Sequence, residues 1–540
     1  MRIIATILAD LDRSPLGTRS RLADDLAGRP VLRRTVERVT QVGGLDAVHV
    51  LCPAEQAERV RALLAGLALS VETYDGAPAP YAALVRTSRM WGLDAWRGGA
   101  GSLCAFDEDF HAPLLNALAA RTGADAVLSI AAAGPLVSPD LCEAMIAHFR
   151  EHAEVARLTI IQAPPGLGAF LIHRDVLADL TATNLPPGAL LVYQPTNPTP
   201  DLTGQDACCR PPVEIIQARG RLLCDTRRST ARVKRLLDAG AETWDARRIA
   251  CELTAEQTRR VEDVPAEIEI ELTTDDPRSG GSLLRPRGAG VGRRGPITPE
   301  VLRRITEWID GQDDVCVLLG GFGEPCLHPD FGRICRALRD GGAASLAVRT
   351  CALVEDPAVE AALFETPVDI IEVTLDAAGA ETFRRVHGLD AYDTALARVE
   401  RWIARRSDER RVRPLIVPSL VKANETLEDL EAFVDTWQRR LGAVSVTGYS
   451  HRAGQCPERA VTSMTPPRRE PCRRVRSRAI ILADGRMTTC DQDFAGRQAL
   501  GSLEITPPAE LWRSELLQRI RTAACPDTPL CPRCEEWHRP

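Results

Sequence analysis

The sequence predicts an α/β protein in three parts: a three-layer αβα domain, a partial (β/α)6 barrel and a small cysteine-rich α+β module. Three observations support this prediction. Short apolar runs alternate with amphipathic helical segments over residues 1–240, and the same rhythm returns over residues 266–450. From Cys472 onward the pattern changes to closely spaced cysteines. Strand–helix alternation is typical of mostly parallel sheets that are covered by helices.

The length of the chain agrees with several domains. Its 540 residues exceed what one core usually holds, and two to four domains are expected at roughly 100–200 residues each. We expect domains at residues 1–240, 266–455 and 456–540, with a helical linker at 241–265. The linker is expected because a polar helical pattern covers about Trp244 to Glu262.

Composition excludes several classes of protein. Hydrophobic residues make up 44% of the chain and charged residues 26%, the balance of a soluble globular protein. The net charge of −7 provides no basic field for nucleic acid. No apolar run reaches the roughly 18 residues that a membrane span needs, and the start, Met1–Ala9, reads as a buried strand. We therefore expect a cytoplasmic protein.

The first two parts consist of strands that alternate with helices. The strands expected in the first part are Ile3–Leu8, Ala47–Leu51, Ala126–Ile130, Leu158–Ile161 and Leu222–Cys224. Those expected in the second part are Glu267–Leu272, Val315–Leu319, Ser345–Arg349, Ile370–Leu375, Leu415–Ser419 and Ala443–Thr447. Thr298 suits a helix N-cap, Pro299 the first helical position and Gly311 a helix end. In such folds the ligand site lies at the C-terminal ends of the strands.

Four C-terminal cysteines form the clearest candidate metal site. Cys531 and Cys534 make a CxxC turn, and Cys472 and Cys490 flank a hairpin whose turn is Asp484–Gly485. Four thiolates suit either a [4Fe–4S] cluster or a structural Zn²⁺, and spacing alone does not separate these two. The alternative is four unligated cysteines, since most of the chain's 17 cysteines stand singly in apolar runs.

The surroundings of these cysteines narrow the choice. The informative segments are Pro471–Cys472, Ile481–Gly485, Cys490–Asp491, Leu500–Ser502, Glu510–Trp512 and the closing Cys531/Cys534 pair. Together they resemble a SPASM/twitch module, which implies an auxiliary iron–sulfur cluster after a radical SAM barrel. Four or five cysteines fit the shorter, one-cluster twitch form. Cys525 is an alternate candidate ligand, and we expect Cys456 to be structural.

The second part carries a strand and glycine motif of its own. Residues 315–330 read as a strand followed by Gly-Gly-x-Gly-Glu-Pro, and later segments are Ile371–Asp376, His387–Gly388, Val421–Glu425 and Gly448–Ser450. These resemble the partial TIM-like barrel of radical SAM enzymes. The resemblance implies an S-adenosylmethionine (SAM) site at Gly320, Gly321, Gly323 and Glu324. Glycines allow close backbone approach, and a carboxylate can pair with an ammonium group.

The barrel departs from that family at its cluster motif. Radical SAM enzymes carry CxxxCxxC after the first strand, and here Asp276, Gly280 and Leu283 occupy the three cysteine positions. None offers a thiolate, which implies loss of the cluster and of the radical chemistry it supports. SAM binding through Glu324 could survive this loss. We prefer the alternative that Gly-Gly-x-Gly-Glu-Pro only shapes a tight strand-to-helix turn.

The first part has degraded motifs as well. The segments Ile4–Ala9, Leu26–Leu32, Ala124–Ile130, Gly134–Pro139 and Arg221–Thr226 resemble a nucleotidyltransferase, specifically a cytidylyltransferase of the CMP-sugar type. That family's Gly-rich basic loop reads here as Asp10–Arg21, with one glycine and two early acids that would repel phosphate. Gly134 replaces the family's Mg²⁺-binding Asp. Asp107, Glu108 and Asp109 could bind a metal, but we favour a solvated loop face.

The order of the three parts resembles the spiro-SPASM type of protein. The first hypothesis is an iron–sulfur-binding pseudoenzyme or scaffold that pairs with an active enzyme. The second is a working enzyme, which transfers a nucleotidyl group to a sugar or performs SAM- or cluster-dependent redox chemistry. The third is a zinc-stabilised binding module. The partner is an unidentified protein or a small-molecule substrate, with no nucleic acid and no membrane span.

Overall fold

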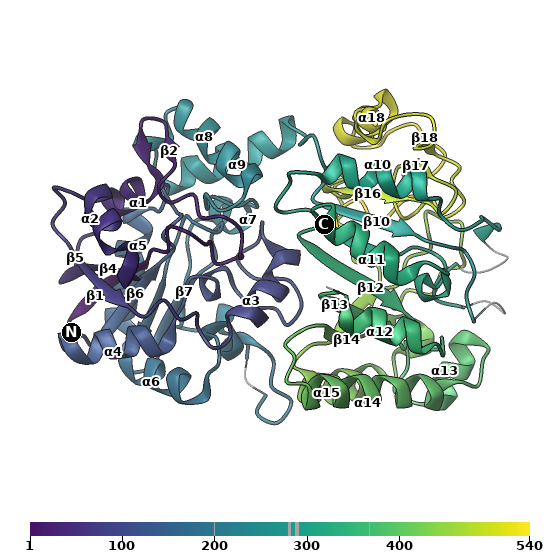
Figure 1. Cartoon of the computed structure of the whole chain (residues 1–540), viewed down its shortest axis with the longest axis horizontal. Helices are drawn as coiled ribbons and strands as arrows, with labels where there is room; N and C mark the ends of the chain where they lie inside the picture. The colour runs from purple at the N-terminus through teal and green to yellow at the C-terminus, as the bar shows by residue number, and fades with distance from the viewer. Residues whose placement is uncertain (199, 279–281, 287–290, 367, 540) are drawn as a thin grey trace. The chain divides into compact units, whose positions relative to one another are not determined.

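The computed structural model describes residues 1–540 except 199, 279–281, 287–290, 367 and 540 (Figure 1). The chain divides into two compact units, Met1–Arg260 and Val261–Pro540. Each unit is built on its own mainly parallel sheet, which confirms the predicted α/β class.

The first unit contains a seven-stranded sheet in the order β5-β4-β1-β6-β8-β7-β9. Its strands are β1 (Ile3–Leu8), β4 (Ala47–Pro53), β5 (Ser70–Tyr74), β6 (Ala126–Ile130), β7 (Leu158–Ile161), β8 (Phe170–His173) and β9 (Cys208–Cys209). Strand β8 runs antiparallel to β6 and β7, while the other pairs are parallel. A separate small hairpin joins β2 (Asp25–Leu26) and β3 (Arg29–Pro30). Strand order reverses between β1 and β6, and ligands bind at such switch points in open sheets.

Helices cover both faces of this sheet. They are α1 (Val31–Val39), α2 (Ala57–Leu63), α3 (Ala82–Arg89), α4 (Ala112–Thr122), α5 (Pro139–His152), α6 (Arg174–Thr183), α7 (Val213–Gln217), α8 (Arg227–Asp238) and α9 (Ala246–Arg259). Successive side chains of a strand point to opposite faces. Accordingly, Ile3, Ala5 and Ile7 pack with α1, α2, α5, α8 and α9, whereas Ile4 packs with α3, α4 and α6. The predicted three-layer αβα arrangement is confirmed.

The second unit contains a nine-stranded sheet in the order β15-β14-β13-β12-β11-β10-β16-β17-β18. Its strands are β10 (Glu267–Glu271), β11 (Cys316–Gly320), β12 (Ser345–Thr350), β13 (Ile370–Thr374), β14 (Leu415–Lys422), β15 (Ser445–Gly448), β16 (Arg478–Ile481), β17 (Arg486–Thr488) and β18 (Ala499–Ser502). All pairs from β15 to β16 are parallel, and β17 and β18 are antiparallel additions. Over the described residues the two edge strands do not pair, so the barrel is open. Because β16 pairs with β10, the cysteine-rich region extends the same sheet.

The two faces of this sheet differ in chemistry. The helices are α10 (Pro299–Ile309), α11 (Phe331–Asp340), α12 (Pro357–Glu365), α13 (Ala380–His387), α14 (Tyr392–Asp408), α15 (Leu430–Leu441), α16 (Arg474–Ser477), α17 (Pro508–Trp512) and α18 (Glu515–Thr522). Ile268 and Ile270 pack with α10, α11, α12, α14 and α15 in one apolar core. Glutamates alternate with these isoleucines and face the other way. Their ion pairs are Glu267 with Arg478, Glu269 with Arg349 (2.8 Å) and Glu271 with Arg294 (2.7 Å).

The local structure agrees with the sequence predictions at the start of α10 and differs from them at Leu222–Cys224. Helix α10 begins at Pro299, and the Thr298 side chain accepts the N–H of Val301, as predicted. The predicted strand at Leu222–Cys224 is wrong. This segment is irregular, and its apolar side chains are buried against the first unit's core. The segment between β18 and the closing CxxC turn forms two short helices, α17 and α18.

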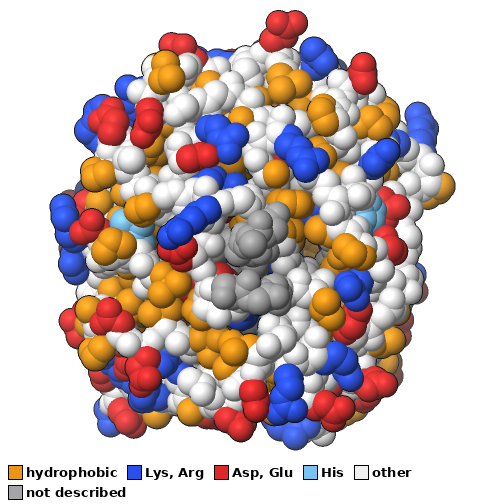
Figure 2. Space-filling view, turned by 90° about the vertical axis from the view of Figure 1, so that its right-hand side faces the viewer, with side chains coloured by type: hydrophobic (Ala, Val, Ile, Leu, Met, Phe, Trp, Pro, Cys, Tyr) orange, Lys and Arg blue, Asp and Glu red, His pale blue; other side chains and the backbone are white. Residues whose placement is uncertain are grey.

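Acidic and basic side chains are interspersed over the face that Figure 2 draws in colour. Across the part of the chain that the structure describes, no helix has both the length and the apolar character to cross a bilayer.

Candidate functional site

The four predicted cysteine ligands come together in one pocket of the second unit. Cys472 precedes α16, Cys490 follows β17, and Cys531 and Cys534 begin and follow a 3₁₀ turn. All four line a pocket whose remaining wall is largely apolar and includes Trp537. The hairpin turn at Gly485 adopts a positive φ of 76°, as the Asp-Gly signal predicts. The structure thus brings together residues that are up to 62 positions apart in the chain.

Hydrogen-bond donors surround the sulfur atoms in this pocket. The N–H of Glu536 donates to Cys534 Sγ at 3.3 Å. Backbone N–H groups of Arg474 and Val475 face the Cys472 sulfur, and that of Gln492 faces the Cys490 sulfur. Donors of this kind stabilise a thiolate more than a thiol, and hydrogen bonds to sulfur tune iron–sulfur clusters.

Two arginines support the pocket from either side. Arg469 donates to the backbone carbonyls of Cys531 (2.6 Å) and Cys534 (3.3 Å), which closes the CxxC turn. Arg474 pairs with Asp491 at 3.0 Å, and its charge also faces Cys472 and Cys490. Cationic side chains beside the sulfurs favour the negative charge that four thiolates bring to any metal or cluster.

Burial raises the pKa of all four thiols. The pKa of Cys534 rises to about 12, and that of Cys490 lies well above its ordinary value. Burial likewise raises the pKa of Cys472 and Cys531. Thiolates are the metal-binding form, so binding at this site must be coupled to the release of protons.

The two other C-terminal cysteines occupy different places. Cys525 is exposed, and its neighbours Ala524 and Pro526 line the pocket while it does not. Cys525 is close enough to Cys531 that its thiolate form would raise the pKa of Cys531. Cys456 packs beside the apolar group formed by Val291, Phe322, Leu482 and Phe494, away from the pocket-lining residues.

The glycine motif after β11 is packed against the chain itself. The Glu324 carboxylate is buried, and its two oxygens accept the N–H groups of Cys326 (3.2 Å) and Cys351 (2.8 Å). A Cβ at Gly323 would lie 2.0 Å from the Thr273 carbonyl oxygen, and one at Gly321 would lie 2.6 Å from Glu271 Cβ. These contacts give internal structural reasons for the motif.

An internal ion pair stands at the first of the three positions where the resemblance to radical SAM enzymes would place a cysteine. Asp276 and Arg278 are both buried, and Arg278 Nε donates to Asp276 Oδ1 at 3.1 Å. Arg278 Nη1 also donates to Thr374 Oγ1 at 3.0 Å, at the end of β13. Position 280 lies outside the described residues, and Leu283 is 39% exposed. An arginine of this chain therefore spans the strand ends at this position.

The acidic cluster of the first unit is also internally paired. Glu108 lies between Arg89 (2.8 Å) and Arg221, with only 2% of its side chain exposed. Asp107 accepts the N–H groups of Cys104 and Gly188, both at 2.6 Å. The prediction of a solvated loop face is therefore wrong, because these carboxylates are buried by their hydrogen-bond and ion-pair partners.

Other motif residues of the first unit also contact the chain itself. Asp10 Oδ1 accepts the N–H groups of Asp12 and Arg13, which folds the loop on itself. A Cβ at Gly134 would lie 3.2 Å from the carbonyl oxygens of Ala131 and Gly166. This spacing leaves little room for an aspartate at position 134.

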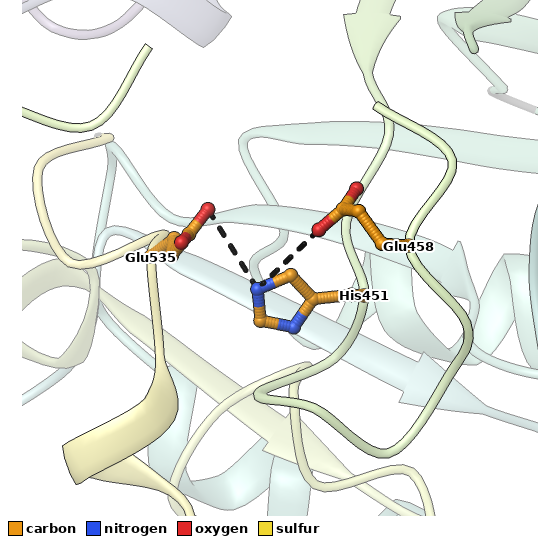
Figure 3. A group of neighbouring side chains, drawn as sticks. All are labelled: His451, Glu458 and Glu535. Atoms are coloured by element: carbon orange, nitrogen blue, oxygen red, sulfur yellow. Dashed lines mark ion pairs between the residues drawn. The ribbon is translucent and has the colours of Figure 1, made fainter. Parts of the chain in front are cut away.

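A third group, His451, Glu458 and Glu535, brings three ligand-type atoms within 4.8 Å (Figure 3). His451 Nε2 lies 4.0 Å from Glu458 and 3.7 Å from Glu535. His451 Nδ1 accepts the N–H of Gly454 at 2.6 Å, so in the neutral ring the proton is on Nε2. The ring presents an N–H, not a lone pair, to the carboxylates, which disfavours metal binding there.

Sequence reasoning identified the cysteines and missed the groups that support them. Arg469 and Arg474 lie within three residues of Cys472, which is the only local signal for their role. Arg278 follows Asp276 by two residues, but its contact with Thr374 spans 96 positions and has no local signal.

Comparison with known proteins gives an independent result for this region. Residues 472–535 match the SPASM family, described as an iron-sulfur cluster-binding domain. The matched segment begins at Cys472 and includes Cys490, Cys531 and Cys534. Residues 472–535 are therefore similar to an iron–sulfur cluster-binding domain family, in agreement with the resemblance noted in the sequence.

Other similarities are more remote. An uncharacterized protein of Treponema pallidum (strain Nichols) is 26% identical over 344 residues, 61% of this chain and 92% of that protein. Streptococcus suis SuiB is 12% identical, with a TM-score of 0.40 over 55% of this chain and 80% of its own. A cytidylyltransferase from Leptospira borgpetersenii is 14% identical, with a TM-score of 0.34 over 48% and 96%. At these TM-scores neither structural similarity carries an argument about function.

Proposed function

We propose that this protein is a non-radical iron–sulfur protein that holds one [4Fe–4S] cluster through Cys472, Cys490, Cys531 and Cys534. The observation that carries the proposal is the convergence of these four thiols, with N–H donors facing three of their sulfurs, inside the segment that matches SPASM. A bound cluster would supply one-electron transfer.

The separation of the sulfurs supports a cluster over zinc. Zn–S bonds of about 2.3 Å in a tetrahedron place neighbouring sulfurs roughly 3.8 Å apart. Among the described residues, three ligand-type atoms lie mutually within 4.8 Å at His451, Glu458 and Glu535, and no three of the cysteine sulfurs do so. A four-iron cluster binds each thiolate through a different iron and accepts the wider separation.

The strand ends of the barrel do not fit the SAM-binding cluster of radical enzymes. Asp276 is neutralised by Arg278, so it is not a free ligand, and Leu283 offers no ligand atom. Glu324 accepts two backbone N–H groups, which leaves it little capacity to hold the ammonium group of SAM. We infer that the barrel is a scaffold for the C-terminal cluster and its partner.

The first unit supports the same interpretation. Glu108 and Asp225 are neutralised inside the unit by Arg221 and Arg89. Together with the crowding at Gly134, this pairing argues against a Mg²⁺-dependent nucleotidyl transfer site.

The deciding experiment is to purify the protein without oxygen, reconstitute it, and count iron, sulfide and zinc per chain. About four irons and four sulfides with little zinc are expected, and no 5′-deoxyadenosine should form from SAM under reducing conditions. About eight irons, or cleavage of SAM, would restore radical chemistry to the barrel. Zinc in place of iron would make the C-terminal region a structural zinc module.

A further inference from the structure

A second depression lies beside the cysteine pocket, entirely within the second unit. Its volume is about 630 Å³, inside the range of roughly 300–1,000 Å³ typical of ligand sites. Val291, Phe494 and Leu530 are among its apolar lining residues, and Gln455, Arg497 and Arg533 supply polar groups. We call this depression the arginine hollow.

The arginine hollow is adjacent to the proposed cluster ligands. Leu530 lines both the hollow and the cysteine pocket. Arg533 lies between Cys531 and Cys534 within the CxxC turn. Ala453 and Gln455 come from the loop after β15, which places the hollow at the C-terminal ends of the parallel strands, where ligands bind in such folds.

The two arginines of the hollow differ from the arginines described above. Both are exposed, and among the described residues neither guanidinium makes a hydrogen bond or an ion pair. In contrast, Arg278, Arg294 and Arg349 each pair with a buried acid. The chain thus leaves two cations unneutralised at the edge of an apolar depression.

The polar groups around these cations are fixed in place. The N–H groups of Arg497 and Gln498 donate to Asp493 at 2.7 and 2.8 Å, which fixes the loop that carries Arg497. The Gln455 amide nitrogen donates to the carbonyls of Arg452 and Gln492, both at 2.8 Å, while its Oε1 is buried without a partner. The hollow therefore offers two cations and an apolar floor.

We propose that the arginine hollow binds a small organic oxyanion, a carboxylate or phosphate ester attached to an apolar group. Guanidinium groups bind carboxylate and phosphate through paired hydrogen bonds, and Phe494 and Leu530 suit the apolar part of the ligand. Binding of this ligand requires only the residues that line the hollow and does not require a cluster. Its coupling to redox chemistry rests on the proposed function, because it requires a cluster on Cys531 and Cys534.

Calorimetry on the reconstituted protein tests the site with three probes: phenyl phosphate, benzoate and inorganic phosphate. We expect one site that prefers phenyl phosphate or benzoate to inorganic phosphate. Arg497→Gln and Arg533→Gln should each weaken binding by about tenfold or more, because each removes a hydrogen bond to a charged group. Phe494→Ala should weaken phenyl phosphate and leave inorganic phosphate nearly unchanged. Arg439→Gln, an exposed arginine of α15, is the matched control and should bind as wild type does.

The outcomes separate this proposal from the proposed function, since iron is counted in every sample. Protein with its full iron that binds none of the probes, or that binds equally well in the Arg497→Gln/Arg533→Gln variant, would overturn the site. Protein without iron would overturn the cluster and leave the binding measurement to decide the hollow by itself. Phenyl phosphate should also shift the electron paramagnetic resonance signal of the reduced cluster in wild type and not in the double variant. Binding without that shift would overturn the coupling.

Discussion

The cysteine pocket and the strand ends of the two sheets use arginine in different ways. At the strand ends, arginines neutralise acids of the same chain, as in Arg278 with Asp276 and Arg221 with Glu108. In the cysteine pocket, Arg469 donates to backbone carbonyls, and the charge of Arg474 faces two sulfurs as well as Asp491. The strand ends are internally satisfied, whereas the cysteine pocket retains groups that favour an added anionic cluster.

The two kinds of site differ in how their charges are balanced. A buried ion pair adds little stability by itself, but removing one partner leaves an uncompensated charge. Asp276 and Arg278 are therefore expected to depend on each other. The thiols of the cysteine pocket must release their protons when they bind a metal, so their raised pKa values make binding depend on pH.

The largest expected effect is on the cysteine pocket. Cys531→Ser/Cys534→Ser should reduce iron from about four per chain to nearly none, since two of four thiolates are lost. Iron and sulfide analysis measures this directly. Cys456→Ser is the matched control and should retain iron, because Cys456 packs with apolar residues outside the pocket. If Cys525→Ser also loses iron, the exposed Cys525 is a ligand and the set of four must be revised.

The next effect concerns the ion pair at the barrel's strand ends. Asp276→Ala should lower the free energy of unfolding of the second unit by about 3–5 kcal/mol, because it leaves Arg278 buried and unpaired. Asp276→Ala/Arg278→Met should recover most of that loss. Denaturant unfolding measures both. Asp330→Ala removes an exposed pair with Arg333 and should cost under about 1 kcal/mol. If Asp276→Ala and Asp330→Ala lowered the free energy of unfolding equally, Asp276 would not be the required partner of the buried Arg278.

A smaller effect is expected from pH on the first unit. Desolvation and the charges of Glu108 and Asp225 raise the pKa of Asp109 to about 8. The folded state therefore holds a proton that the unfolded state releases near pH 4, and this stabilisation is lost as pH rises through about 8. Between pH 6 and pH 9 the free energy of unfolding of the wild-type unit should fall by about 2 kcal/mol more than that of Asp109→Asn. Asp238→Asn, on the exposed side of α8, should follow the wild-type curve. Parallel curves for wild type and Asp109→Asn would show that the carboxyl is ionised throughout.

The cysteine pocket could be predicted from sequence because its signals are local. A CxxC turn and an Asp-Gly hairpin each act over a few residues, and Thr298 and Pro299 set the start of α10 in the same way. The alternation of Ile268 and Ile270 with glutamates likewise shows which residues share a face.

The remaining features depend on distant contacts. The burial of Glu108 requires Arg221, which lies 113 positions away, so the acidic run reads from sequence as solvated. The apolar run of β8 carries no signal of strand direction, and its antiparallel place beside β6 follows from the packed fold. The arginine hollow has no motif, because its residues come from loops separated by more than 200 positions.

The smallest expected effect is the absence of SAM binding at the glycine motif. A Cβ at Gly321 or Gly323 would collide with Glu271 or Thr273, so packing within the chain already accounts for these glycines, and Glu324 already accepts two N–H groups. Calorimetry with SAM on the reconstituted protein should therefore give no one-site heat, in wild type or in Glu324→Gln. A one-site signal that disappears in Glu324→Gln would mean that the strand ends can exchange internal hydrogen bonds for those of a ligand. The strand ends and the cysteine pocket would then both bind a cofactor, and they would differ only in how many internal contacts must break first.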